Sequence, residues 1–254
     1  MKQRHVAALV AEALGVFALV LSVLSVSRLG YPFFTAIAAG VTITVMVSAF
    51  GKISGGHFNP AITISALAIR NISPLRALGY VIVQVAGAFA AFKVFEMLVN
   101  QKLPNTAGSF DWRVFTAEAI GALIFGSAVA AVITQKIEGY QAAYTIGAGL
   151  FLGIIAATLA SAGVLNPAVA VGVRAMDVNY IFGPIVGALV GFGLVAFVIN
   201  PVISDKKTVV PTVAVKKTVV PAAVAAKKTV TPVAEKKVAK KAPAKKTTKK
   251  AAKK

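Results

Sequence analysis

The 254-residue sequence contains no cysteine, which excludes a disulfide scaffold, a thiolate metal site and a cysteine nucleophile. Charge is also scarce, since only 14% of the residues are charged and just eight are acidic. The two histidines, His5 and His57, are isolated, and no carboxylate cluster or nucleotide-binding loop is present. The sequence therefore contains no catalytic constellation, and we expect neither an enzyme nor a bound metal or cofactor.

What the sequence has in abundance is apolar residues, at 57%, with a mean hydropathy of +0.81 that is far above that of a soluble domain. The formal net charge of +19 would by itself suggest a nucleic-acid binder. The distribution of this charge along the chain argues against a nucleic-acid binder. Residues 205–254 hold 16 lysines and two acidic residues, a net charge of +14, whereas residues 1–204 carry only +5. The body of the chain is therefore apolar and nearly uncharged.

Six stretches in this body are long enough to cross a membrane, which takes about 20 mainly apolar residues. They lie at roughly 6–26, 33–50, 74–98, 113–134, 140–160 and 180–200. Two further apolar pieces, 61–69 and 168–173, are too short to span, and each follows an Asn-Pro pair. Half-length apolar segments in corresponding places of two halves predict discontinuous helices that line a cavity.

The two halves correspond in sequence. The run AEALG at 11–15 recurs as AEAIG at 117–121, and the run NPA at 59–61 recurs at 166–168, so the offsets are 106 and 107. Each half has three spanning segments, an odd number, so the second half must enter the membrane inverted relative to the first. This predicts an all-α membrane protein with an inverted repeat and a substrate path at the repeat interface.

Each Asn-Pro-Ala run predicts the start of a half-helix, because Asn favours the N-cap and Pro suits the first helical position. Capping occupies the asparagine oxygen and leaves the amide N–H₂ free to donate. Two such donors facing each other would hold the oxygen of a water or an alcohol, and the converging positive helix ends would repel cations. A simple turn is the alternative for one copy. Two copies at the repeat offset favour the paired site.

The run ISGGHFNPAIT at 53–63 resembles the first signature of the major intrinsic protein family, the aquaporins and aquaglyceroporins. The resemblance covers roughly residues 5–200 and extends to Glu12, Glu118, the run RALGY at 76–80 with Gln84, Gly183-Pro184 and Gly187-Ala188. It implies a right-handed aquaporin-like bundle of six transmembrane helices plus two re-entrant half-helices. Such channels are usually homotetramers with one pore in each subunit.

The resemblance also implies roles for individual residues. Asn59 and Asn166 would be the paired donors at the pore centre, and Pro60 and Pro167 would start the half-helices. Backbone carbonyls before each asparagine would line the pore, namely those of Gly55, Gly56, His57, Gly163, Val164 and Leu165.

Two kinds of titratable residue accompany these pore positions. The family's buried glutamates, here Glu12 and Glu118, would hold the re-entrant loops, with a proton relay as the alternative. For His57, packing at the pore entrance is favoured over a pH-sensing role.

The second signature departs from the family, because Val169 stands where most members have an arginine that narrows the pore. Arg174 lies on a different helical face and is not expected to substitute for it. The family's spacing places the constriction at Ala39, Ile154, Gly163 and Val169, with no aromatic and no charge. This predicts a wide, apolar passive channel for water and small neutral solutes such as glycerol. A secondary transporter or a structural membrane protein on a channel fold are the alternatives.

We expect a channel domain over residues 1–204, with repeat halves at about 6–105 and 113–200, followed by a tail. The tail, 205–254, is rich in Lys, Pro, Val and Ala and is predicted to be disordered. It would be simply solvated or bind anionic lipid or another polyanion. Six spans place both termini on the same side of the membrane. The short segments on that side hold slightly more basic residues than those on the other side, which predicts that both termini are cytoplasmic.

Overall fold

A computed structural model describes residues 2–204, and every regular element in that range is helical. Six helices are long and apolar enough to cross a membrane, at Gln3–Ser27, Pro32–Ser54, Pro74–Val99, Trp112–Thr134, Gly139–Ala157 and Val178–Ile203. The six predicted spans are therefore confirmed. Among the span ends, the largest shift is in the second span, which ends at Ser54 rather than near residue 50, and the fifth ends at Ala157 rather than near residue 160. The predicted tail at 205–254 lies outside the described residues.

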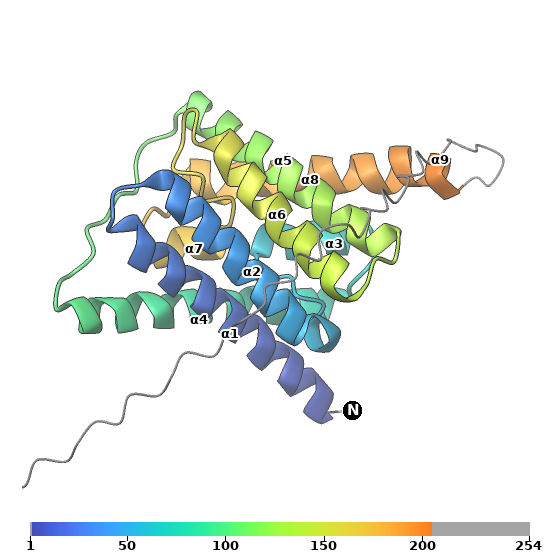
Figure 1. Cartoon of the computed structure of the whole chain (residues 1–254), viewed down its shortest axis with the longest axis horizontal. Helices are drawn as coiled ribbons and strands as arrows, with labels where there is room; N and C mark the ends of the chain where they lie inside the picture. The colour runs from blue at the N-terminus through green and yellow to red at the C-terminus, as the bar shows by residue number, and fades with distance from the viewer. Residues whose placement is uncertain (1, 205–254) are drawn as a thin grey trace, which may run out of the picture. The chain divides into compact units, whose positions relative to one another are not determined.

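Shorter helices accompany the six long ones, and Figure 1 labels α3 and α7 among them. The elements in chain order are α1 (Lys2–Ser27), α2 (Pro32–Ser54), α3 (Pro60–Ala68), α4 (Pro74–Val99), α5 (Trp112–Thr134), α6 (Gly139–Ala157), α7 (Pro167–Gly172), α8 (Val178–Gly193), the π-helix η1 (Leu194–Ile199) and α9 (Asn200–Ser204). With nine and six residues, α3 and α7 cross only part of a ~30 Å hydrocarbon core. They are the two half-helices that the sequence predicts.

The same helix pairings occur in both halves of the chain. In the first half α1 packs against α2 and α4, and in the second half α5 packs against α6 and α8. The halves are joined by α2 against α6, which lie side by side in Figure 1, and by each half-helix against the last long helix of the other half. This pairing confirms the predicted all-α inverted-repeat fold.

Glycines allow the helices of this bundle to approach closely. A Cβ atom added to Gly121 of α5 would lie 2.6 Å from the carbonyl oxygen of Gly153 of α6, and one added to Gly153 would lie 2.5 Å from that of Gly121. Gly87 of α4 faces the backbone of Ala13 of α1 in the same way. Without a hydrophobic driving force between helices in lipid, such backbone contacts supply the packing energy.

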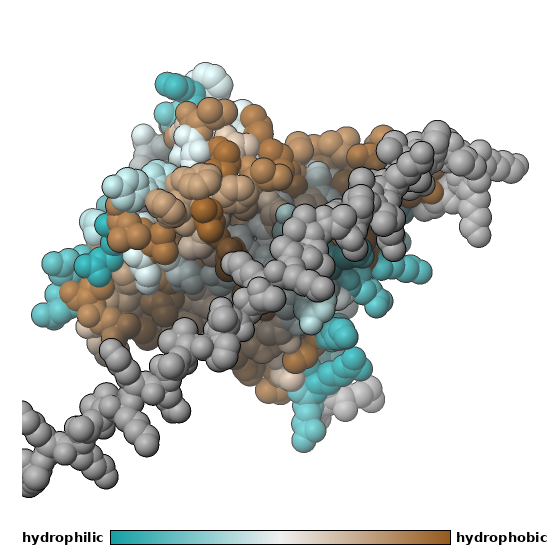
Figure 2. All heavy atoms as spheres, in the orientation of Figure 1, coloured by the Kyte–Doolittle hydropathy of each residue, from teal (hydrophilic) through white to brown (hydrophobic). Residues whose placement is uncertain are grey.

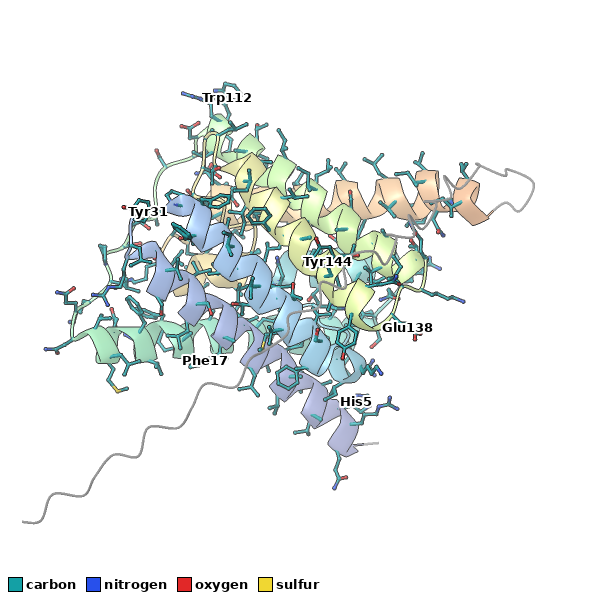
Figure 3. The ribbon with its side chains drawn as sticks, viewed as in Figure 1. His5, Phe17, Tyr31, Trp112, Glu138 and Tyr144 are labelled. Atoms are coloured by element: carbon teal, nitrogen blue, oxygen red, sulfur yellow. The ribbon has the colours of Figure 1, made fainter. Side chains whose placement is uncertain are left out.

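Apolar residues cover much of the face of the bundle that Figure 2 shows. Large side chains such as Ile82, Phe89 and Leu152 are more than half exposed, as expected for helices that face lipid. Polar and amphipathic residues gather at the two ends. Figure 3 shows Tyr31 and Trp112 at one end of the bundle and His5 and Glu138 at the other.

Candidate functional site

Each half-helix begins at an asparagine that caps it. Asn59 has an extended backbone, with φ −160°, and its Oδ1 accepts a hydrogen bond of 2.8 Å from the amide of Ala61. Asn166 has φ −153°, and its Oδ1 accepts from the amides of Ala168 at 3.0 Å and Val169 at 3.4 Å. Proline follows both asparagines at the first helical position, where a missing N–H costs nothing. The caps fix the side chains with their amide nitrogens pointing away from their own helices.

The amide nitrogens link the two halves to each other. Asn59 Nδ2 donates to the carbonyl of Leu165 at 2.9 Å, and Asn166 Nδ2 donates to the carbonyl of Phe58 at 2.9 Å. The sequence analysis treated these amides as wholly free, but one of the two N–H groups on each is used in this cross-link. An amide nitrogen carries two hydrogens, so each asparagine keeps one N–H for a solute.

Glu12 holds the first re-entrant loop from inside the bundle. Its two carboxylate oxygens accept from the backbone amides of His57 at 3.0 Å and Phe58 at 2.6 Å. Gln84 of α4 donates to the same carboxylate at 2.8 Å. Glu12 is completely buried, and three donors offset the cost of burying its charge.

Glu118 repeats this arrangement in the second half. Its oxygens accept from the amides of Val164 at 2.9 Å and Leu165 at 2.7 Å, and the third donor is the hydroxyl of Ser161 at 2.8 Å. Glu118 is completely buried as well. In this geometry each carboxylate is hydrogen-bonded to the loop that precedes the asparagine of its own half.

Phe58 is a site residue that the sequence analysis missed. It adopts φ +47°, and Leu165 adopts φ +52°, a conformation uncommon for residues other than glycine. This turn aims each carbonyl at the opposite asparagine, while the side chains of both residues are fully buried. The repeat offset of 107 maps Leu165 onto Phe58, so the signal was present. The three carbonyls predicted for the first loop end at position 57, whereas those of the second loop end at 165, which corresponds to position 58. The two predicted sets therefore differ by one residue.

The same offset pairs a serine in each loop. Ser54 Oγ accepts from the amide of Gly56 at 3.0 Å, and Ser161 Oγ accepts from the amide of Gly163 at 3.0 Å. Both glycines have positive φ, +68° and +66°, which glycine adopts without steric cost. Gly55, another predicted pore residue, ends α2 in the left-handed conformation with φ +99°.

His57 is packed into the first half rather than exposed. Its Nδ1 lies 3.2 Å from Thr63 Oγ1, and its ring meets that of Tyr80 edge-on at 5.4 Å between centroids. Gln84 also donates to Thr63 Oγ1, at 3.0 Å, so the imidazole belongs to the network that holds Glu12. This is the packed position that the sequence analysis favoured.

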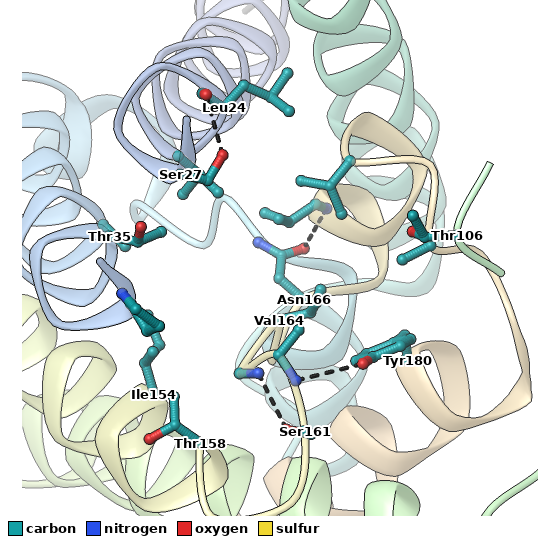
Figure 4. A pocket seen from close by; sticks show the side chains of 18 of the residues that line it. Leu24, Ser27, Thr35, Thr106, Ile154, Thr158, Ser161, Val164, Asn166 and Tyr180 are labelled. Carbon is teal, nitrogen blue, oxygen red and sulfur yellow. Dashed lines mark hydrogen bonds between the residues drawn. The ribbon is translucent and has the colours of Figure 1, made fainter. Parts of the chain in front are cut away.

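A cavity of about 620 Å³ opens above the second re-entrant loop (Figure 4). All four residues assigned to the constriction, Ala39, Ile154, Gly163 and Val169, line it. Val164 and Asn166 line it too, whereas Asn59, His57 and the other predicted residues of the first loop do not. The structure thus brings the constriction residues together around one of the two asparagines.

The cavity wall has two kinds of surface. Many of its lining side chains are aliphatic, and no charged side chain of the described residues lines it. The other kind is hydroxyl groups, and the sequence analysis identified none of them. They belong to Ser27, Tyr31, Thr35, Thr106, Thr158, Ser161 and Tyr180, most of which are labelled in Figure 4.

Arg174 does not line this cavity. It follows α7 in the left-handed conformation, with φ +58°, and its guanidinium donates to the carbonyl of Leu103 at 3.0 Å. The guanidinium also lies 5.6 Å from the centre of the Phe92 ring. Arg174 therefore holds the segment between the halves and does not line the cavity.

Comparison with known proteins gives results that agree with this geometry. The family described as Major intrinsic protein matches residues 1–199. Glycerol uptake facilitator protein-like 6 of Lactiplantibacillus plantarum is 35% identical over 145 residues, which cover 54% of this chain and 67% of that protein. Nodulin-26 of Glycine max is 28% identical over 221 residues, which cover 79% and 82%.

Further similarity is found in an animal protein and in a solved structure. Aquaporin-1 of Rattus norvegicus is 30% identical over 184 residues, which cover 66% of this chain and 68% of that protein. The X-ray structure of the aquaglyceroporin from Plasmodium falciparum superposes with a TM-score of 0.65 at 21% identity, over 78% of this chain and 98% of that one. At this identity the superposition concerns the fold alone.

Proposed function

Because the chain belongs to the major intrinsic protein family, we propose that this integral, multi-pass membrane protein is a passive channel whose constriction is wide, apolar and without arginine. The family membership supports conduction of water or small solutes. The finer assignment has its main support in one observation, the meeting of Ala39, Ile154, Gly163 and Val169 in a single cavity beside Asn166.

The two asparagines would form the centre of the path. Each has one amide N–H left after the cross-links to Leu165 and Phe58, and an N–H donor binds the oxygen of water or of an alcohol. The half-helices α3 and α7 begin at these asparagines, so their positive ends face the passing solute. That field opposes cations, and without a filter arginine it is the main electrostatic barrier to them.

The composition of the cavity favours small polyols in addition to water. Carbon–hydrogen edges of a solute such as glycerol would lie against aliphatic lining residues such as Ile154, Val164 and Val169. Its hydroxyl groups would donate to the serine and threonine oxygens of the lining, most of which already donate their own hydrogen within the protein. A site with a few placed polar groups on an otherwise apolar wall binds neutral amphipathic molecules. The Lactiplantibacillus relative is named as a glycerol uptake facilitator-like protein, which agrees with this assignment.

Two rival functions fit the contacts less well. A secondary transporter needs a coupling group that can change its protonation or its ion occupancy. Both intramembrane glutamates, Glu12 and Glu118, are fully engaged with three donors each. A structural membrane protein would not need an open cavity that ends at an asparagine amide. Both features favour the passive channel.

The remaining parts of the proposal concern organisation. Residues 1–204 would form the channel domain, with repeat halves at about 6–105 and 113–200, and residues 205–254 a separate basic tail. The channel would assemble as a homotetramer with one path in each subunit. Both termini would be cytoplasmic, with the tail available to anionic lipid headgroups or other polyanions.

A permeability panel on proteoliposomes tests the proposal. Stopped-flow light scattering would compare water, glycerol and urea, with sucrose as the impermeant osmolyte and a potassium gradient as the ion control. Fast water and glycerol flux without any imposed ion gradient is the expected result. Rapid water flux with glycerol and urea excluded would contradict the wide constriction. Flux that requires an ion gradient would favour the transporter.

A further inference from the structure

A second cavity, of about 330 Å³, lies at the end of the bundle opposite Tyr31 and Trp112, where Figure 3 shows His5. It is lined by Arg4, His5, Ala8, Ile53 and Arg76. Three of these five residues carry basic side chains, Arg4 and His5 from α1 and Arg76 from α4. The first turn of each of these helices contains no acidic residue. None of the five lines the larger cavity of the proposed channel.

Two of the basic side chains of this cavity, those of Arg76 and His5, face each other, and no carboxylate of residues 2–204 lines the cavity. Arg76 Nη2 lies 3.5 Å from His5 Nδ1, so a guanidinium that can only donate points at an imidazole nitrogen. Within residues 2–204 the sole salt bridge joins Lys93 to Glu96, and no acidic side chain pairs with Arg4 or Arg76. Two guanidinium groups around one cavity repel each other, and a bound anion would relieve that repulsion.

The helix starts add to the positive field at this position. Arg4 lies in the first turn of α1 and Arg76 in the first turn of α4, where free backbone N–H groups place partial positive charge. Guanidinium groups bind phosphate oxygens in bidentate fashion, and helix starts add to the attraction. The chemistry of the cavity is that of a phosphate site.

The surroundings of the cavity favour a phosphate that is attached to a lipid. Its other two lining residues, Ala8 and Ile53, are apolar. Close to Arg76 on α4, Leu75 and Leu78 are 82% and 59% exposed, as on a surface that contacts acyl chains. Basic pockets between transmembrane helices at the membrane surface bind anionic headgroups, whereas a free phosphate would gain nothing from the apolar neighbours.

We infer that this cavity binds the phosphate of an anionic phospholipid headgroup through Arg4 and Arg76, with the acyl chains along the exposed face of α4. The site is independent of the proposed conduction path. It also differs from a general attraction between lipid and the lysine-rich segment, because it requires two particular guanidinium groups.

Calorimetric titration of the full-length protein in nonionic detergent tests this site at about 0.15 M salt, which screens diffuse charge attraction. The ligands are dihexanoyl-phosphatidylglycerol, dihexanoyl-phosphatidylcholine and inorganic phosphate. The variants are Arg4→Gln/Arg76→Gln and a control pair, Arg70→Gln/Lys136→Gln. The control removes two exposed basic residues on the same predicted side of the membrane but outside the cavity.

We expect one saturable phosphatidylglycerol site in the wild type and in the control pair. The Arg4→Gln/Arg76→Gln pair should bind about tenfold or more weakly, since both charge-assisted hydrogen bonds to the phosphate are lost. Equal affinity in all three proteins, or an equal loss in both pairs, would overturn the site. Phosphatidylcholine binding as tightly as phosphatidylglycerol would do so too. Arginine-dependent binding of inorganic phosphate without phosphatidylglycerol binding would overturn the assignment to lipid. If the double variant does not fold, Arg4→Gln alone, at an exposed position, gives the same comparison.

Discussion

Asn59 Nδ2 lies 2.9 Å from the carbonyl oxygen of Leu165, a residue 106 positions further along the chain. The bond joins the half-helix start of one repeat to the re-entrant loop of the other, and Asn166 returns the same contact to Phe58. The asparagines that would bind a solute are thus also the clasp between the halves. Their two roles make separate predictions.

Replacing Asn59 by alanine should destabilise the protein by about 2 to 4 kcal/mol. The cap on Ala61 contributes about 1 kcal/mol, and the buried carbonyl of Leu165 loses its partner at a cost of about 1 to 3 kcal/mol. Denaturant unfolding in detergent measures the change. Asn105→Ala is the matched control, because its Oδ1 also accepts from the amide two residues later, on Ala107, but at an exposed site. Equal losses in the two variants would contradict the clasp.

Neutralising Glu118 as Glu118→Gln should cost about 2 kcal/mol or more. Glutamine places an N–H₂ against the amides of Val164 and Leu165, so at least one buried donor loses its acceptor. Thermal melting in detergent and size-exclusion profiles report the loss. Glu138→Gln changes an exposed glutamate whose side chain does not cap its helix, and should melt like the wild type. A Glu118→Gln protein that melts normally but loses flux would contradict this structural role and support a role in transport.

Introducing arginine as Val169→Arg should narrow the proposed constriction and restore a positive charge to it. Glycerol permeability should fall at least about tenfold while water flux persists, because the added side chain excludes the larger solute first. Proteoliposome swelling measures both. Val169→Leu adds bulk without charge and separates size from electrostatics. Unchanged glycerol flux in Val169→Arg would show that position 169 lies outside the narrow part of the path.

The Gly153→Ala substitution should destabilise the contact between α5 and α6 by about 1 to 3 kcal/mol, the usual cost of overpacking. The new methyl group would meet the carbonyl of Gly121 at 2.5 Å and Leu165 at 3.0 Å. Gly193→Ala is the control, since a Cβ there meets nothing within 4 Å and alanine favours helix. Unfolding in detergent compares them. If Gly193→Ala destabilises the protein as much as Gly153→Ala does, the close approach of the α5 and α6 backbones is not the cause.

The sequence predicted the helices well because lipid imposes a strict rule on them. Spans such as Trp112–Thr134 follow from apolar length, and the start of α7 follows from Asn166 and Pro167. The glutamates were found because their positions repeat at nearly the same offset as the asparagines. These signals are local or periodic, so they can be read along a single chain.

The partners of these residues were harder to predict, because they depend on contacts across the repeat. No local pattern identifies Leu165 as the acceptor for Asn59, and none brings Leu103 and Thr106 to the cavity. Those two residues lie in the irregular segment between the halves, where Arg174 and Glu96 hold the backbone of Leu103. A position in such a segment is set by tertiary contacts that have no periodicity.

The division of bonds between the halves bears on how the chain is assembled during synthesis. Glu12 binds His57 and Phe58 within the first half, so that half can order its loop as soon as it is inserted. The amide of Asn59 must wait for Leu165, which at ~5–20 residues per second emerges about 5 to 20 s later. During that interval the side-chain amide of Asn59 has no hydrogen-bond partner from the second half. Insertion of the second half is then the event that closes the centre of the fold.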